Sequence, residues 1–113
     1  MSSDTEDDQI FKALSSGLRR RMLDALKAGP QTTGSLCAAF QTLDRCTIMQ
    51  HLKVLEDAGL VVAVRKGRER WNHLNALPIK RIHDRWIGPY AAAAADRLAA
   101  LDVALPPGPV SDR

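Results

Sequence analysis

Hydrophobic positions in the first half of the chain recur at spacings of three and four residues, which is the period of amphipathic helices. We expect a first helix capped by Thr5, and a second helix capped by Ser16 and stopped by Gly29 and Pro30. The expected apolar positions are Ile10, Phe11 and Leu14 in the first helix, and Leu18, Met22, Leu23 and Leu26 in the second. The pattern therefore predicts two short amphipathic helices before the middle of the chain.

Residues 33–58 predict two more helices, separated by the short turn at residues 41–43. Thr32 or Thr33 is expected to cap the first of them and Asp44 the second. The expected core positions are Leu36, Ala39 and Phe40 in the shorter helix, Leu43 before the longer one, Ile48, Leu52 and Leu55 along it, and Leu60 after Gly59 ends it. This order is the sequence shape of a helix-turn-helix, whose second helix lies in the DNA major groove.

Residues 61–74 predict a β-hairpin directly behind that helix, with a β-branched first strand, Gly67 at the tip, and Trp71 and Leu74 in the return strand. Its basic residues are Arg65, Lys66, Arg68 and Arg70, offset by Glu69. A basic hairpin can enter the minor groove or follow phosphates, and strand alternation predicts that Arg68 and Arg70 point the same way. The alternative is a charge run that protects an exposed edge.

Residues 78–105 predict a last helix, with Pro78 in its first turn and a kink at Gly88 and Pro89. Its apolar stripe is longer than one small core can cover, so we expect an isologous dimer interface. The residues expected to form this interface, together with the first helix, are Ile10, Leu14, Trp86, Ile87, Tyr90, Leu98 and Leu101.

The predicted fold class is mainly α with a small β-hairpin, a winged helix-turn-helix with dimer-forming terminal helices. A chain of 113 residues with 4% aromatic residues fits one small, mostly helical domain, expected at 5–105. Within it lie the helix-turn-helix (33–58), the wing (61–74) and the dimerisation helix (78–105). Residues 1–4 and 106–113 are expected to be disordered tails.

The net charge is +3, but the first eight residues hold four acids and no base, so the remainder carries 16 bases against 9 acids. A basic body favours a polyanionic partner. No long apolar run or secretory signal occurs, which predicts a cytoplasmic protein without a membrane partner. The sequence holds no Gly-rich phosphate loop and no nucleophile beside a base, so we expect neither an enzyme nor a cofactor.

The helix at 44–58 presents a polar and basic face opposite its apolar stripe, and side chains of these types read bases or hold phosphates. Its candidate DNA-binding residues are Arg45, Thr47, Met49, Gln50, His51 and Lys53, which join the hairpin residues Arg65, Lys66, Arg68 and Arg70. Gln50 suits adenine, Arg45 suits guanine, and Lys53 suits phosphate. A merely solvated helix face is the alternative, as is a winged helix that docks on a protein.

Two further groups of residues, a run of arginines and the two cysteines, could have a binding or redox role. Three consecutive arginines, Arg19–Arg21, open the second helix and can either touch phosphate or pair within the chain, for example with Asp24. Cys37 is expected in the core and Cys46 near a helix N-terminus, a location that lowers a thiol pKa. A DNA-binding thiol switch at Cys46 is therefore a further alternative, whereas the scattered histidines and two cysteines predict no metal site.

Several segments together resemble the ArsR/SmtB-type bacterial repressors over about residues 9–105. The most specific is His51–Leu55 followed by Ala58–Leu60, and the others are Ile10–Ser15, Arg19–Arg21 and Arg65–Arg68. The resemblance implies a homodimer joined by its first and last helices that binds a palindromic operator in double-stranded DNA and represses transcription.

The chain departs from the metal-sensing members of that family. Those members carry a Cys-x-Cys-type motif in the third helix, where this chain has Thr32 and Gly34 and keeps only Cys37. Acid and histidine pairs of the last helix are reduced here to His83 and Asp84. The resemblance is thus to members without a metal site, and it assigns no small-molecule effector.

Overall fold

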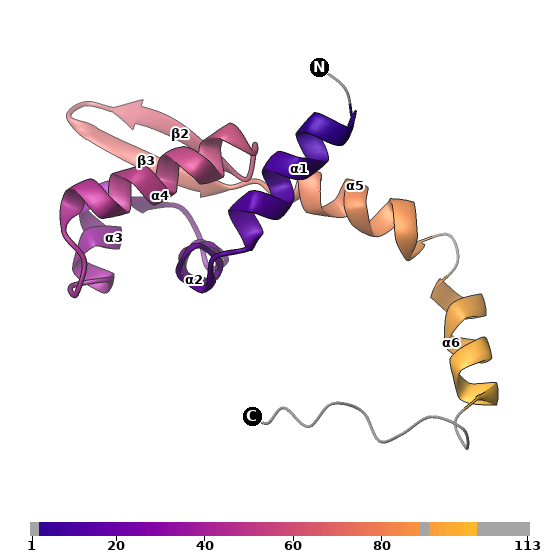
Figure 1. The fold of residues 1–113 in the computed structure, drawn as a ribbon. Coiled ribbons are helices and arrows are strands. Elements are labelled where there is room, and N and C mark those ends of the chain that lie inside the picture. The colour runs from indigo at the N-terminus through magenta and orange to yellow at the C-terminus, as the bar shows by residue number, and fades with distance from the viewer. Residues whose placement is uncertain (1–2, 89–90, 102–113) are drawn as a thin grey trace. The chain divides into compact units, whose positions relative to one another are not determined.

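The computed structural model describes residues 3–88 and 91–101 (Figure 1). The chain divides between Lys80 and Arg81 into two compact units, which are described separately. The elements are α1 (Ser3–Leu14), α2 (Gly17–Leu26), β1 (Gln31–Thr32), α3 (Thr33–Ala39), α4 (Arg45–Asp57), β2 (Val61–Lys66), β3 (Glu69–Leu74), α5 (Leu77–Trp86) and α6 (Ala91–Ala100).

At the junction of α1 and α2, the predicted start of α2 is confirmed. Ser16 caps α2 by accepting a hydrogen bond from the backbone N–H of Arg19 at 3.3 Å. The start of α1 was placed wrongly, because the helix begins at Ser3 rather than after Thr5. Acidic residues in the first turn stabilise this earlier start against the helix dipole, so the expected loose tail at 1–4 is helical from Ser3.

Pairing of Arg19 with an acid was one of the expected options, but among the described residues the structure shows no such ion pair. Its Nε donates to the carbonyl oxygen of Ala13 and its Nη2 to that of Lys12, each at 2.9 Å. These carbonyls lie in the last turn of α1. The Lys12 carbonyl also accepts from the backbone N–H and the hydroxyl of Ser15, and the guanidinium adds further hydrogen bonds at the negative end of the helix dipole. Asp24 instead pairs with Lys27 at 3.4 Å on the surface.

The helix-turn-helix consists of α3 and α4. Thr32 caps α3 through the backbone N–H of Ser35 at 3.0 Å, and Asp44 caps α4 through that of Thr47 at 2.7 Å. Leu36 is fully buried, but Ala39 is exposed, because the seven-residue α3 turns only one narrow side to the core.

The sheet has three strands in the order β1-β3-β2, all antiparallel. The hairpin of β2 and β3 matches the predicted wing, and Gly67 adopts a φ of 62° at its tip. Strand β1 is absent from the sequence prediction. Its two residues pair with Asn72 and Trp71 of β3. The two-residue segment Gln31–Thr32 has no local pattern that predicts this pairing.

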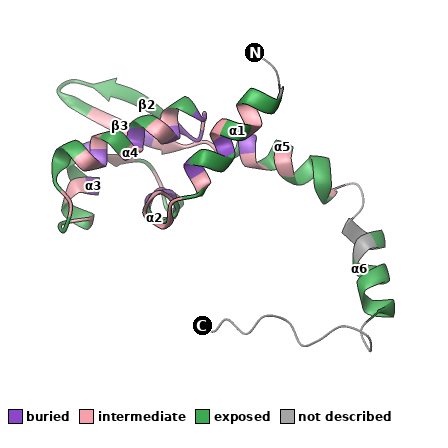
Figure 2. Cartoon of the chain, viewed as in Figure 1, coloured by how far each residue is buried: buried purple, intermediate pink, exposed green. Residues whose placement is uncertain are grey.

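The core of the first unit lies where α1, α2 and α4 meet the sheet, and it contains the apolar stripe predicted for α4 (Figure 2). Ile48, Leu52 and Leu55 are all 0% exposed, as is Leu60 beyond the positive-φ Gly59. Each such side chain contributes about 1.5–3 kcal/mol by leaving water. Figure 1 shows α4 held alongside the β2–β3 hairpin by this packing.

The predicted single kinked helix at 78–105 is two helices. Helix α5 ends at Trp86, before Gly88, and α6 is a separate element that ends at Ala100. A glycine followed by a proline without an N–H removes the helical hydrogen bonds that a mere kink would keep. Pro89, Tyr90 and the predicted tail at 106–113 lie outside the described residues. Within the described ranges, no helix is both long and apolar enough to cross a membrane.

Candidate nucleic-acid interface

Helix α4 turns its polar face outward because its apolar stripe fixes its rotation. Arg45, Gln50 and Lys53 are exposed, while Thr47, Met49 and His51 are half-buried on its flanks. Lys53 pairs with Asp57, one turn later, at 3.5 Å in solvent, where such a pair contributes little. The side chains predicted to face DNA therefore lie on the surface or at its edge.

The cap at Asp44 fixes where α4 begins, and with it the position of Arg45. The backbone N–H of Thr47, followed by the Thr47 hydroxyl, holds the pKa of Asp44 below its ordinary value. The carboxylate is therefore charged and capping at neutral pH.

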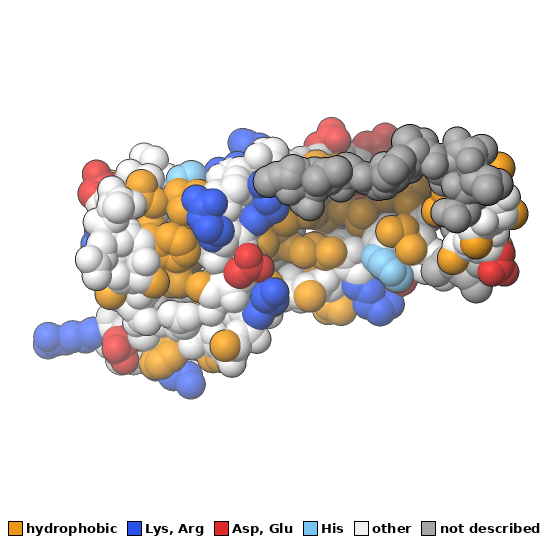
Figure 3. Space-filling model, turned by 90° about the horizontal axis from the view of Figure 1, so that it is seen from below, with side chains coloured by type: hydrophobic (Ala, Val, Ile, Leu, Met, Phe, Trp, Pro, Cys, Tyr) orange, Lys and Arg blue, Asp and Glu red, His pale blue; other side chains and the backbone are white. Residues whose placement is uncertain are grey.

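The hairpin presents two kinds of arginine. Arg65, Lys66 and Arg68 are exposed, but Arg70 is half-buried and forms an ion pair with Glu56 of α4. Arg68 lies in the turn before β3, so strand alternation does not govern its direction. A basic side chain projects from the end of the molecule where the hairpin tip and the start of α4 lie (Figure 3).

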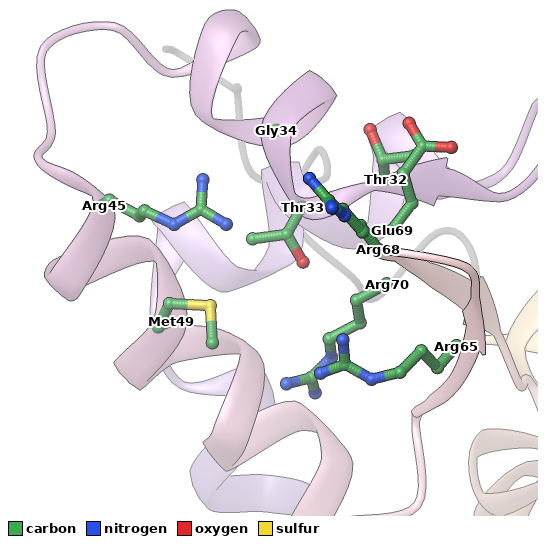
Figure 4. Close-up of a pocket in the computed structure, with 9 residues that line it drawn as sticks. All are labelled: Thr32, Thr33, Gly34, Arg45, Met49, Arg65, Arg68, Glu69 and Arg70. Atoms are coloured by element: carbon green, nitrogen blue, oxygen red, sulfur yellow. The ribbon is translucent and has the colours of Figure 1, made fainter.

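A pocket of about 390 Å³ lies between α3, α4 and the hairpin (Figure 4). Figure 4 shows Arg45 and Met49 reaching into it from α4, and Arg65, Arg68 and Arg70 reaching into it from the hairpin. Its lining residues are Thr32, Thr33, Gly34, Arg45, Met49, Arg65, Arg68, Glu69 and Arg70. The lining thus holds four guanidinium groups and one carboxylate, and Arg70 among them is paired with Glu56, so the surface keeps an excess of positive charge.

Asn72 is a positioning residue that the sequence analysis missed. It is 0% exposed, and its Nδ2 donates to the Gln31 carbonyl and to the Thr33 hydroxyl, both at 3.2 Å. It thereby ties β3 of the hairpin to the start of α3. A polar residue between Trp71 and His73 in a half-buried strand was the only available signal, and it does not reveal the partner.

Arg19 is a second positioning residue. The sequence analysis allowed it a partner within the chain, but did not predict that it connects the end of α1 to α4. Its Nη1 lies 3.1 Å from Nδ1 of His51, and since arginine only donates, the imidazole nitrogen accepts. Burial, and then the Arg19 charge, lower the pKa of His51. Through Nδ1, His51 thus accepts a hydrogen bond that connects α4 to Arg19.

The residues predicted for dimerisation divide into two groups. Trp86, Ile87, Leu98 and Leu101 are each more than half exposed on or beside α5 and α6, and Arg85 stacks 4.7 Å over the Trp86 ring. Ile10, by contrast, is 1% exposed and belongs to the core, and Leu14 is half-buried, so Phe11 at 47% is the apolar surface residue that α1 offers. Tyr90 lies outside the described residues.

The cysteines are both free, with Cys37 half-buried and Cys46 exposed. Among the residues that the structure describes, no group of three or more His, Cys, Asp or Glu side chains could hold a metal ion.

A helix-turn-helix followed by a basic β-hairpin defines the winged helix-turn-helix class of DNA-binding folds. A family described as a helix-turn-helix domain matches residues 14–64. The chain is 40% identical over 86 residues to the uncharacterised HTH-type transcriptional regulator YuzN of Bacillus subtilis (strain 168), covering 71% of this chain and 94% of that protein.

Two further similarities define the family more closely. The transcriptional repressor SdpR of the same organism is 35% identical over 68 residues, which cover 60% of this chain and 74% of SdpR. The solved structure of an ArsR-like transcriptional regulator from Rhodococcus sp. RHA1 superimposes with a TM-score of 0.67 at 28% identity, covering 92% of this chain and 96% of that chain. This chain belongs to the ArsR family of helix-turn-helix transcriptional regulators and is not an enzyme.

Proposed function

We propose that this regulator is a homodimeric repressor that binds a palindromic operator in the bacterial cytoplasm. Each protomer inserts α4 into the major groove and lays its β2–β3 wing on the adjoining DNA. The observation that carries this proposal is the shared pocket, because side chains of α4 and of the wing converge on one strongly basic space. A protein-docking face is expected to be more apolar at its centre than this one.

Different side chains of α4 contact bases and phosphates. Gln50 is exposed at the middle of the outward face and matches the N6 and N7 atoms of adenine. Met49 offers an apolar contact to a thymine methyl, and Thr47 and Lys53 reach phosphates on either side. Arg65 and Lys66 of the wing bind the backbone without reading the sequence.

Dimerisation supplies the second half of the operator contact. In a two-fold dimer, the exposed apolar residues of α5 and α6 contact the same residues of a second protomer, and Phe11 of α1 is a separate apolar contact. Two recognition helices related by this symmetry contact half-sites about 34 Å apart, one helical turn of DNA. The similarity to SdpR, a transcriptional repressor, supports repression as the outcome.

The test is a titration of the purified protein against the DNA upstream of its own gene and against a scrambled duplex of equal length, at two salt concentrations. We expect saturable binding with a stoichiometry of two protomers per native duplex, and a large preference for it over the scrambled one. Gln50→Ala should lose that preference, whereas Arg65→Ala should weaken binding to both duplexes. Failure to bind either duplex at low salt contradicts the proposal.

A further inference from the structure

The pocket between α3, α4 and the wing contains more cationic groups than its surroundings neutralise. Arg70 is paired with Glu56, but within the described part of the chain Arg45, Arg65 and Arg68 have neither an ion pair nor a hydrogen bond from their side chains. Glu69 is the single acid in the lining. The space therefore keeps a net positive charge after its own pairs are counted.

The other polar groups of the pocket are poised to donate. The Thr32 hydroxyl oxygen accepts from the Ser35 N–H at 3.0 Å, and the Thr33 hydroxyl oxygen accepts from Asn72 Nδ2 at 3.2 Å. Each hydroxyl accepts one hydrogen bond, and its own O–H group can donate to an incoming acceptor. Donors from β1, α3, α4 and the hairpin thus surround a space of about 390 Å³, which has room for a phosphodiester group and a flanking sugar.

The direction of Arg45 decides what this side chain contacts. Arg45 is the first residue of α4, and Figure 4 shows its guanidinium turned sideways across the pocket toward Thr33, opposite Arg68, which approaches from the wing. A side chain that reads a base must point along the outward face of the recognition helix, as Gln50 does. Two guanidinium groups facing each other across a gap suit one shared anion, which both can hold through charge-assisted hydrogen bonds.

We propose that this pocket seats one backbone phosphate of the DNA, clamped by Arg45 and Arg68. Arg45 is then a phosphate-positioning residue and not the guanine-reading residue that its place on the recognition helix suggested. The clamp fixes the duplex between α4 and the wing, so that both elements engage in one register. This inference deepens the proposed function and depends on it.

The experiment uses the full-length protein and a duplex selected by the wild type from a random pool. Dissociation constants of wild type, Arg45→Gln, Arg68→Gln and the double variant are measured by fluorescence anisotropy on the selected and a shuffled duplex, across a salt series. Arg81→Gln is the matched control, because it removes the same charge from exposed α5, outside the pocket. Circular dichroism checks that every variant is folded.

We expect Arg45→Gln and Arg68→Gln each to weaken binding about tenfold, by equal factors on both duplexes, and to reduce the slope of log K against log salt by about one. Replacing single phosphates by neutral methylphosphonates should reveal one position per half-site that weakens the wild type, weakens each single variant less, and leaves the double variant unaffected.

Each other outcome has a distinct meaning. Loss confined to the selected duplex, with an unchanged salt slope, assigns Arg45 to base reading and overturns the clamp while the proposed function stands. Loss of equal size in Arg81→Gln also overturns the clamp, since any surface charge then acts alike. If the wild type selects no duplex and binds none, the proposed function fails, and the clamp fails with it.

Discussion

The ion pair between Glu56 of α4 and Arg70 of β3 is expected to hold the wing against the recognition helix. Replacing Glu56 by Gln removes the charge but nearly keeps the shape. Arg70 is then left with a half-buried guanidinium whose Nε is already buried without a partner. Besides Glu56, the acids near Arg70 are Glu69, in the lining of the same pocket, and Asp57, which lines a neighbouring pocket with Arg70 and is paired with Lys53.

The magnitude follows from how deeply the pair lies. The Arg70 and Glu56 side chains are 26% and 30% exposed, between a solvated pair and a fully buried one. Solvated pairs contribute about 0.2–1 kcal/mol, whereas breaking a buried pair costs about 3–5 kcal/mol. We therefore expect Glu56→Gln to reduce the free energy of unfolding by about 2 kcal/mol, close to a hydrogen bond to a charged group.

The assay is a double-mutant cycle by urea unfolding, with wild type, Glu56→Gln, Arg70→Met and the double variant at one protein concentration. We expect a coupling free energy of about 1–2 kcal/mol. If the two single effects on the free energy of unfolding add within about 0.5 kcal/mol, the stabilising role of the Glu56–Arg70 ion pair is refuted, because the effects of two residues that do not interact are additive. A Lys53→Met and Asp57→Asn cycle serves as the control, since that exposed pair is expected to show almost no coupling.

Four further predictions concern the contacts and the packing that position α4 and the wing. Arg19→Ala should raise the pKa of His51 toward its ordinary value, measured by NMR titration of the imidazole; an unchanged pKa contradicts the role of the Arg19 charge. Since the folded pKa of His51 is lowered, the protein should lose stability as pH falls from about 6.5 through that lower pKa, so the difference between the urea midpoints of wild type and His51→Gln should be constant above about pH 7 and change below it. Asn72→Ala should cost about 1–3 kcal/mol by leaving buried groups of Gln31 and Thr33 without their donor, and equal stability would show that water replaces the amide. Leu52→Ala should cost about 2–5 kcal/mol in thermal unfolding because the site is 0% exposed, and a smaller loss would mean that the core collapses around the gap.

Local chemistry along the chain was enough to predict the main helices of the first unit and the wing. Ser16, Thr32 and Asp44 cap their helices through hydrogen bonds within three residues, so sequence neighbours alone decide these starts. The stripe of Ile48, Leu52 and Leu55 and the positive φ of Gly59 and Gly67 are equally local. The prediction failed at Thr5 and at 78–105, where helix ends depend on weakly specified terminal turns and on a Gly-Pro break.

The tertiary structure alone decided how the candidate site is assembled. Strand β1 exists because Gln31 and Thr32 find β3 across some forty residues, and Asn72 is buried because Thr33 lies opposite it. The sequence places Arg70 among the basic residues of the wing. Only the packing of α4 against the wing brings Arg70 to Glu56, and the ion pair then neutralises its charge. Short segments of the sequence determine where the helices of this protein begin and which of their faces are apolar. The partner of each charged side chain is decided by packing between segments far apart in the chain.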